Sequence, residues 1–208
     1  MTCRVLPLEI WDATVHGATL FAQRAAPSFF ESLAEVAARL DCADVALCGG
    51  GVDVVRAREA FAARGLDVAW VSDDPFFAAD AALAYADVVV DVGQTSLKAI
   101  GPLGRKRLPR AADDSLTAFT ASIATAVASV GGGARVIVAL PCTIDAGHLG
   151  DSSYPTRGPV SAFIAALGRD AEVVNDAVLA ARAVPPPARG RRLVLTVGHG
   201  VGAAMVER

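Results

Sequence analysis

The sequence predicts a mixed α/β protein built from two halves of similar plan. Apolar, β-branched runs of strand length alternate with amphipathic segments of helical period along most of the chain. At 88–100 and at 191–207, a strand is followed by a glycine-containing turn and a second strand. When the chain is read as a circle starting at Arg191, the order β-β-β-α-β-α-β-α occurs twice, the second time over 88–184. This repeated order of elements is the main evidence for the fold class.

Length and composition are those of a compact protein with a substantial apolar core. The chain has 208 residues, of which 53% are hydrophobic and 20% charged, and its formal net charge is −3. That length accommodates one large domain or two small lobes. No basic run with interleaved aromatic residues is present, so nucleic acid is not an expected partner. No apolar run approaches the length of a membrane-spanning helix, so no membrane association is expected.

The cysteines indicate a reducing compartment. Cys3, Cys42, Cys48 and Cys142 include no CxxC pair, and three of them sit in or beside apolar, strand-like runs. This pattern is typical of buried thiols rather than of a disulfide framework or a zinc site. We therefore predict a cytoplasmic protein.

The first part of the chain is expected to alternate strands with helices. Arg4–Ile10 alternates weakly and predicts a strand, and Ala13–Phe21 is a candidate second strand. A helix is expected over Ser28–Leu40, with Ser28 and Glu31 forming a capping box. The following elements are strand 45–47, helix 52–64 ended by Gly65, strand 68–71 and helix 76–86. This order is typical of parallel strands joined by crossover helices.

The second part repeats the plan after a hairpin of strands 88–92 and 96–100. A third strand is expected near 105–110. The basic cluster Arg105-Lys106-Arg107 with Arg110 is more simply explained as a solvated turn between strands than as a phosphate patch. The next elements are a helix from Asp114 or Ser115 to Val130, strand 135–140, a polar loop at 147–158, helix 160–167, strand 172–174 and helix 177–184. The last strand pair runs over 191–207. Arg4 and Glu207 should therefore be neighbours, flanking a missing hairpin turn.

The segment Asp91-Val92-Gly93-Gln94-Thr95-Ser96-Leu97-Lys98 carries the most informative chemistry. An acid at a strand end, a glycine turn, hydroxyl residues and a lysine together suit a metal-bound phosphate. The acid would hold hydrated Mg²⁺, backbone N–H groups would face phosphate oxygens, and the lysine would neutralise charge. An ordinary tight hairpin explains the same residues, so both interpretations stay open on this segment alone.

Two further glycine segments favour nucleotide binding when all three are considered together. Gly198-His199-Gly200-Val201-Gly202 lies between the last two strands, and Gly49-Gly50-Gly51 follows strand 45–47 and precedes a helix. A glycine turn that opens a helix allows the close approach of a nucleotide. Each segment alone is more simply explained as a turn.

Five motifs in a consistent cyclic order resemble the sugar kinase, heat-shock protein and actin superfamily, and most closely the ROK group of sugar kinases. They are Asp91–Lys98, Leu140–Asp145, Val174–Ala181, Gly198–Ala203 and Leu47–Val52. Their order in this chain is circularly permuted relative to that family. The resemblance implies two RNase H-like (actin-like ATPase) lobes with an ATP cleft between them. One lobe would cover 88–189, and the other would combine 1–87 with 190–208.

The resemblance also implies a role for each motif in ATP-dependent phosphorylation of a hydroxyl group on a sugar or similar small metabolite. Asp176 would be the general base, Asn175 and Asp145 would bind the acceptor, and Asp91 would hold Mg²⁺ through water. The residues implied to contact ATP are Gly93, Gln94, Thr95, Ser96, Lys98, Gly198, His199, Gly200, Gly202, Gly49, Gly50 and Gly51. Asp176 also suits the cap of the helix that it begins, and the two roles can coexist.

Three alternatives stay open. The chain is short for such a kinase and lacks the Glu-x-Gly-His segment that contacts sugar in ROK proteins, which favours a non-catalytic metabolite- or nucleotide-binding member of the superfamily. The Asp-x-Gly-x-Thr pattern also fits an acyl-phosphate or pantothenate-type kinase. An unrelated α/β binding protein would use its glycines only for turns. In each case the apolar residues Phe76-Phe77-Ala78 are a candidate homodimer contact.

Overall fold

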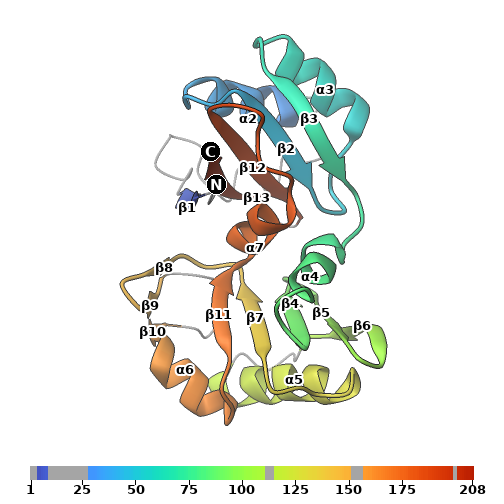
Figure 1. The fold of residues 1–208 in the computed structure, drawn as a ribbon, viewed down its shortest axis with the longest axis vertical. Coiled ribbons are helices and arrows are strands. Elements are labelled where there is room, and N and C mark those ends of the chain that lie inside the picture. Colours follow the sequence, from blue (N-terminus) through green and yellow to red (C-terminus); the bar gives the residue numbers. More distant parts are fainter. Residues whose placement is uncertain (1–3, 9–27, 111–114, 151–156, 199–200) are drawn as a thin grey trace. The chain divides into compact units, whose positions relative to one another are not determined.

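The protein is a mixed α/β structure in which helices flank the sheets (Figure 1). The computed structural model describes residues 4–8, 28–110, 115–150, 157–198 and 201–208. Contacts divide the chain into two compact units. Unit 1 comprises Met1–Pro75 and Ala180–Arg208, and unit 2 comprises Phe76–Leu179.

Unit 1 contains a five-stranded sheet of order β1-β13-β12-β2-β3 (Figure 1). The strands are β1 (Arg4–Leu8), β2 (Asp44–Cys48), β3 (Asp67–Ser72), β12 (Arg191–Val197) and β13 (Val201–Glu207). β1, β13 and β12 pair antiparallel, whereas β12, β2 and β3 pair parallel. Arg4 is the register partner of Glu207. The prediction that these two residues are neighbours is therefore confirmed.

Two helices, α2 (Phe29–Ala38) and α3 (Val54–Ala62), share an apolar core with the unit 1 sheet. Alternate residues of β2 and β12 face this core because successive side chains of a strand point to opposite sides. The largest side chains buried there are Phe29, Phe30, Phe61, Leu47, Leu193 and Leu195. Burial of this apolar surface is the main contribution to the stability of the unit.

The helix starts of unit 1 differ from the predicted ones. Ser28 adopts φ −79° and ψ 3°, not the extended conformation of a capping residue, and its side chain makes no capping hydrogen bond. The predicted capping box is therefore wrong. Helix α3 begins at Val54 rather than at Val52 because Asp53 caps it, accepting a hydrogen bond from the Arg56 N–H at 3.2 Å. Gly65 has a left-handed φ of +73° beyond the end of this helix, as expected.

Unit 2 contains a second five-stranded sheet, of order β11-β7-β4-β5-β6 (Figure 1). Its strands are β4 (Val88–Val92), β5 (Ser96–Gly101), β6 (Gly104–Pro109), β7 (Val136–Leu140) and β11 (Glu172–Asn175). β6, β5 and β4 pair antiparallel, and β4, β7 and β11 pair parallel. Matched strand for strand, the two sheets have the same order and the same pattern of strand directions.

Alternation along the strands gives the unit 2 sheet two apolar faces. Val88, Val90 and Val92 belong to a core shared with α5 (Leu116–Ser129) and α6 (Val160–Leu167). Residues of the opposite face, such as Val89, Ile100 and Ile137, pack with residues of α4 (Phe77–Ala82) and α7 (Asp176–Ala183). Asp91 alternates with the three valines and so belongs to the second face.

The connections of unit 2 contain further ordered elements. Ser115 caps α5 by accepting a hydrogen bond from the Ala118 N–H at 3.2 Å. Part of the loop expected at 147–158 belongs to a small antiparallel sheet of order β10-β9-β8. Its strands are β8 (Ile144–Asp145), β9 (His148–Leu149) and β10 (Gly158–Pro159). The strand predicted at 13–21 lies outside the described residues.

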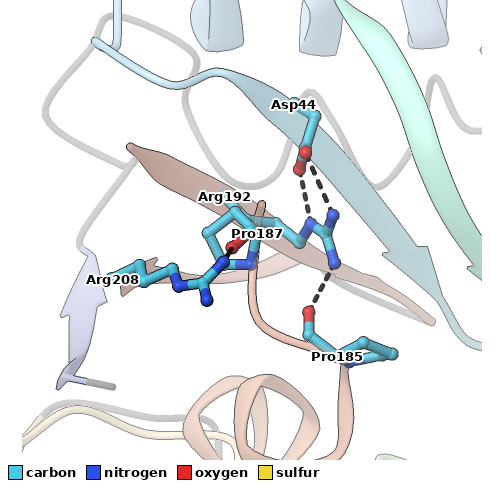
Figure 2. Close-up of polar contacts among 5 residues, drawn as sticks. All are labelled: Asp44, Pro185, Pro187, Arg192 and Arg208. Atoms are coloured by element: carbon cyan, nitrogen blue, oxygen red, sulfur yellow. Dashed lines mark hydrogen bonds and ion pairs between the residues drawn. The ribbon is translucent and has the colours of Figure 1, made fainter. Parts of the chain in front are cut away.

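A buried ion pair joins β12 to β2 in unit 1 (Figure 2). Arg192, which is 7% exposed, is the register partner of Asp44. Its Nε and Nη2 donate to the two carboxylate oxygens, with 3.0 Å between Nη2 and Oδ2. Its Nη1 donates to the carbonyl of Pro185, and Arg208 donates to the carbonyl of Ala188 at 2.8 Å. The two arginines therefore attach the proline-rich segment 185–188 to the rest of unit 1.

We expect Asp44→Ala to lower the free energy of unfolding by about 3 kcal/mol, because it leaves the buried Arg192 cation without its carboxylate. Urea unfolding followed by circular dichroism measures the change. The matched control is Glu35→Ala, which removes the carboxylate of the exposed Glu35–Arg39 pair and should cost less than about 1 kcal/mol. Equal losses in the two variants would contradict the structural role of the Asp44–Arg192 pair.

Candidate functional site

The topology of unit 2 gathers charged and polar residues at one edge of its sheet. The parallel strands β4, β7 and β11 end at the same edge, where Asp91 is in register with Ala139 and Asn175 with Leu140. Lys98 lies directly opposite Asp91 in the β4–β5 pair. Asp176 follows β11 as the first residue of α7. Residues that are distant in sequence therefore meet at the carboxyl ends of these strands.

Asp91 and Lys98 form an ion pair across β4 and β5. The Lys98 Nζ donates to the Asp91 Oδ2. Both side chains are largely covered, with exposures of 18% for Asp91 and 19% for Lys98. Directly opposite residues of antiparallel strands extend from the same face of a sheet, so the pair lies on the face that packs with α4 and α7.

Asp176 has a carboxyl group whose acidity is strongly perturbed. Burial, and secondly the negative charge of Asp91, raise the pKa of Asp176 to about 7. The Ala177 N–H, which donates to Oδ1 at 2.8 Å, and the positive charge of Lys98 act in the opposite direction. A carboxylate with a pKa near neutrality is a stronger base than an ordinary one and can accept a proton at physiological pH.

Asn175 caps helix α7 in place of Asp176. Its Oδ1 accepts a hydrogen bond from the Val178 N–H at 3.1 Å, and its Nδ2 donates to the carbonyl of Cys142 at 2.8 Å. The first bond satisfies an N–H of the first helical turn, and the second ties the loop after β7 to the end of β11. The capping role considered for Asp176 thus belongs to the preceding residue.

The turn between β4 and β5 depends on glycine. The Gly93 N–H donates to the carbonyl of Ser96 at 2.9 Å, and a Cβ on Gly93 would lie only 3.0 Å from that oxygen. Thr95 is exposed at the turn, and Gln94 is half-buried. The buried Ser96 Oγ accepts a hydrogen bond from the Arg107 Nε at 3.0 Å.

Sequence reasoning did not assign Arg107 to this site, because a solvated turn was preferred to a phosphate patch. Its cluster was interpreted as a solvated turn, but Arg105, Lys106 and Arg107 all lie within strand β6. The solvated turn is therefore wrong, whereas the third strand expected near 105–110 is confirmed, and the three residues are exposed as expected. The alternation of side chains along the predicted strand could have identified Arg107, because it places Arg107 and Lys106 on opposite faces of the sheet.

In unit 1 the glycines at 49–51 lie against the end of β12. Gly49 has a φ of +106°, and a Cβ there would be 2.5 Å from the Val197 carbonyl oxygen. The Gly51 N–H donates to the same oxygen at 3.1 Å. The segment is therefore adjacent to the residue that precedes Gly198. Gly202 donates its N–H to the Thr196 Oγ1 at 3.1 Å, whereas His199 and Gly200 lie outside the described residues.

Asp145 lies in the β8–β9 hairpin, opposite His148. The two turn residues, Ala146 and Gly147, have φ values of +44° and +79°, the left-handed conformations of a type I′ turn. Asp145 is exposed, and among the described residues no ion pair or hydrogen bond joins it to Asp91, Lys98 or Asp176. Its predicted role in acceptor binding stays a prediction.

Within the described ranges, no group of three or more His, Cys, Asp or Glu side chains is arranged to hold a metal ion. No helix in the described part of the chain has both the length and the apolar character needed to cross a membrane.

Comparison with solved structures finds a remote likeness to a glucokinase from an Antarctic psychrotroph. The match has a TM-score of 0.39 and 23% sequence identity, and it covers 58% of this chain and 46% of that chain. The aligned part therefore spans less than half of the glucokinase. No protein-family model and no curated protein matches the chain.

We expect Asp176→Asn to stabilise the protein at pH 8 and to lose this advantage near pH 4. Because the folded-state pKa of Asp176 is about 7, above the unfolded value of about 3.9, the folded wild type binds this proton more tightly. The contribution of Asp176 to wild-type stability should therefore fall as the pH rises from 4 to 8. The gain at pH 8 should be on the order of a few kcal/mol, since one pKa unit corresponds to about 1.4 kcal/mol.

Urea unfolding at both pH values measures this difference. Asn keeps an oxygen that can accept the Ala177 hydrogen bond, so the substitution removes mainly the charge. The control is Asp170→Asn at an exposed position of the same unit, which should show no comparable dependence on pH. If Asp176→Asn changed the free energy of unfolding equally at both pH values, the raised pKa of Asp176 would be contradicted.

Proposed function

We propose that the protein catalyses ATP-dependent, Mg²⁺-dependent phosphorylation of a hydroxyl group on a sugar or similar small metabolite. The observation that carries the proposal is the cluster of Asp91, Lys98 and Asp176 at one edge of the unit 2 sheet. Phosphoryl transfer requires mainly positioning and neutralisation of charge, together with a base that accepts the proton of the attacking hydroxyl. The cluster supplies a carboxylate for a hydrated cation, a lysine and a second carboxylate with a raised pKa.

In this proposal Asp176 removes the proton from the acceptor hydroxyl. A pKa near 7 leaves much of the group ionised at neutral pH and makes it more basic than an ordinary carboxylate. Asn175 fixes the start of the helix that bears Asp176, and one N–H of its amide is left to meet an acceptor hydroxyl. Asp145 is proposed as a further acceptor contact.

Asp91 is the residue proposed to hold Mg²⁺ through water. A single carboxylate with water and phosphate ligands fits the coordination that Mg²⁺ prefers. When bound, the ion would neutralise charge on the transferred phosphoryl group. Lys98 pairs with the Asp91 carboxylate that would hold the ion. Its positive charge would therefore help the ion to neutralise the transferred phosphoryl group.

The glycine segments are proposed to contact ATP through their backbones. In unit 2 the contacts come from Gly93, Gln94, Thr95 and Ser96, together with Lys98. In unit 1 they come from Gly49, Gly50, Gly51, Gly198, His199, Gly200 and Gly202. The close packing of Gly49 and Gly51 on Val197 supports this assignment because it makes two of the three proposed segments neighbours within one unit.

We further propose that both units are RNase H-like lobes and that the chain is circularly permuted. Numbered along the chain from β12 in unit 1 and from β4 in unit 2, both sheets have the strand order 3-2-1-4-5. The pairing of Arg4 with Glu207 supports the permutation, because a hairpin turn would join these residues in an unpermuted chain. The proposed lobes are 88–189 and 1–87 with 190–208, whereas the compact units change at 75/76 and 179/180.

A non-catalytic protein that binds a metabolite or nucleotide is the second candidate. The short chain and the missing Glu-x-Gly-His segment favour it. Such a protein would be stabilised by ATP without turning it over. The two candidates therefore differ in a measurement that does not require the acceptor to be known in advance.

We expect ATP turnover that depends on Mg²⁺ and on a hydroxyl-bearing acceptor, measured as ADP release across a panel of sugars and small polyols. Asp176→Asn should lower kcat at least about 100-fold, because it removes the base. The control Asp170→Asn makes the same chemical change at an exposed position and should keep wild-type activity. Thermal stabilisation by ATP without turnover would support the non-catalytic candidate, and no stabilisation would indicate an unrelated α/β protein.

For the active wild type we expect kcat/KM to rise with pH through about 7 and then to level off. Asp176 must be ionised to accept a proton, and burial and Asp91 raise its pKa to about 7. A pH–rate profile from pH 5 to 9 at constant ionic strength measures the midpoint. A profile that is already flat at pH 5 would contradict a base with a raised pKa.

A further inference from the structure

Arg107 lies on the same face of the unit 2 sheet as the proposed catalytic cluster. It is directly opposite Lys98 in the β5–β6 register, and Lys98 is directly opposite Asp91 in the β4–β5 register. Residues in this relation extend from the same face, so the three side chains form a row across three strands. Lys106 belongs to the other face, where Leu108 packs against the core that contains α5.

The guanidinium of Arg107 is held at the glycine turn. Its Nε donates to the Oγ of Ser96, which is 8% exposed and immediately follows the turn. This bond uses one of the five N–H donors of the guanidinium and leaves the fork formed by the others available. Ser96 thus orients the cation at the end of the turn where a phosphate has been proposed.

The charges on this face differ in how they are compensated. Within the part of the chain that the structure describes, Lys98 pairs with Asp91 and Arg105 pairs with Asp80. Arg107 has a neutral hydroxyl partner there and forms no ion pair with a described carboxylate. A polyphosphate brings several negative charges. An arginine without a carboxylate partner among the described residues is better placed to neutralise them than a lysine already paired with an acid.

We propose that Arg107 adds a further anion contact beside the turn at 93–96, so that the two form a subsite for the polyphosphate chain of a nucleotide. The identity of the ligand as ATP rests on the proposed function, whereas the recognition chemistry requires only a polyphosphate. The planar guanidinium matches two phosphate oxygens at once, which a lysine cannot do. Ser96 acts as a positioning residue. Its hydrogen bond already restricts the Arg107 side chain, so less conformational entropy is lost when the anion binds.

The test compares two substitutions in one strand of the full chain. Arg107→Gln and Lys106→Gln remove the same charge from adjacent exposed positions on opposite faces of β6. Isothermal titration with inorganic tripolyphosphate and with Mg·ATP measures binding. We expect Arg107→Gln to weaken both about tenfold or more, the loss typical of a charge-assisted hydrogen bond. Lys106→Gln should leave both nearly unchanged.

Two further variants separate charge from geometry. Arg107→Lys keeps the charge but loses the fork, so we expect binding between that of the wild type and that of Arg107→Gln. Ser96→Ala keeps the arginine and removes its anchor, so a smaller loss is expected. Thermal unfolding should be close to that of the wild type for the exposed substitutions, which excludes misfolding as the cause.

The outcomes distinguish this inference from the proposed function. Tripolyphosphate binding that is lost in Arg107→Gln supports the subsite even if the protein transfers no phosphoryl group. Turnover of ATP with equal KM values in Arg107→Gln and Lys106→Gln overturns the subsite and leaves the kinase proposal intact. A wild-type protein that binds no tripolyphosphate also overturns the subsite.

Discussion

The register of β4 within its sheet is the constraint on which the site of unit 2 depends. Val88, Val90 and Val92 are buried on the face that contains α5, so Asp91 extends from the opposite face. A slip of one residue would exchange the faces and place the Asp91 carboxylate in the apolar core shared with α5 and α6. Burial of three valines therefore determines where a charged residue lies. The positions of Lys98 and Arg107 follow from that register through the neighbouring strands.

The perturbed acidity of Asp176 is a consequence of the same arrangement. The parallel pairing of β4, β7 and β11 brings Asp91 and Asp176 to one edge, where burial and mutual repulsion disfavour a second negative charge. Asn175 supplies the helix cap and ties down the preceding loop, so the aspartate is not needed for capping. A carboxyl group whose pKa is strongly raised by burial and a neighbouring charge is typical of functional sites.

Local sequence patterns predicted most elements but not all of their ends. Strand 88–92 and helix 160–167 agree with the structure residue for residue, because each has a clear apolar period and a sharp boundary. The start of α3 was misplaced because Asp53 competes with the preceding glycines as the capping residue. The expected capping box at Ser28 failed because the serine backbone is not extended. Caps depend on one or two dihedral angles that composition does not specify.

The amino-acid sequence by itself determined the order of strands and helices, the glycine turn after β4 and the list of acids that could serve a phosphate site. These features follow from hydrophobic period and turn chemistry, which act over a few residues. Only the tertiary structure decided that Asp91, Lys98 and Asp176 meet, that Asn175 is the cap and that Arg107 joins the site. Those outcomes depend on strand register and burial between segments far apart in the chain, and local propensity carries no information on either.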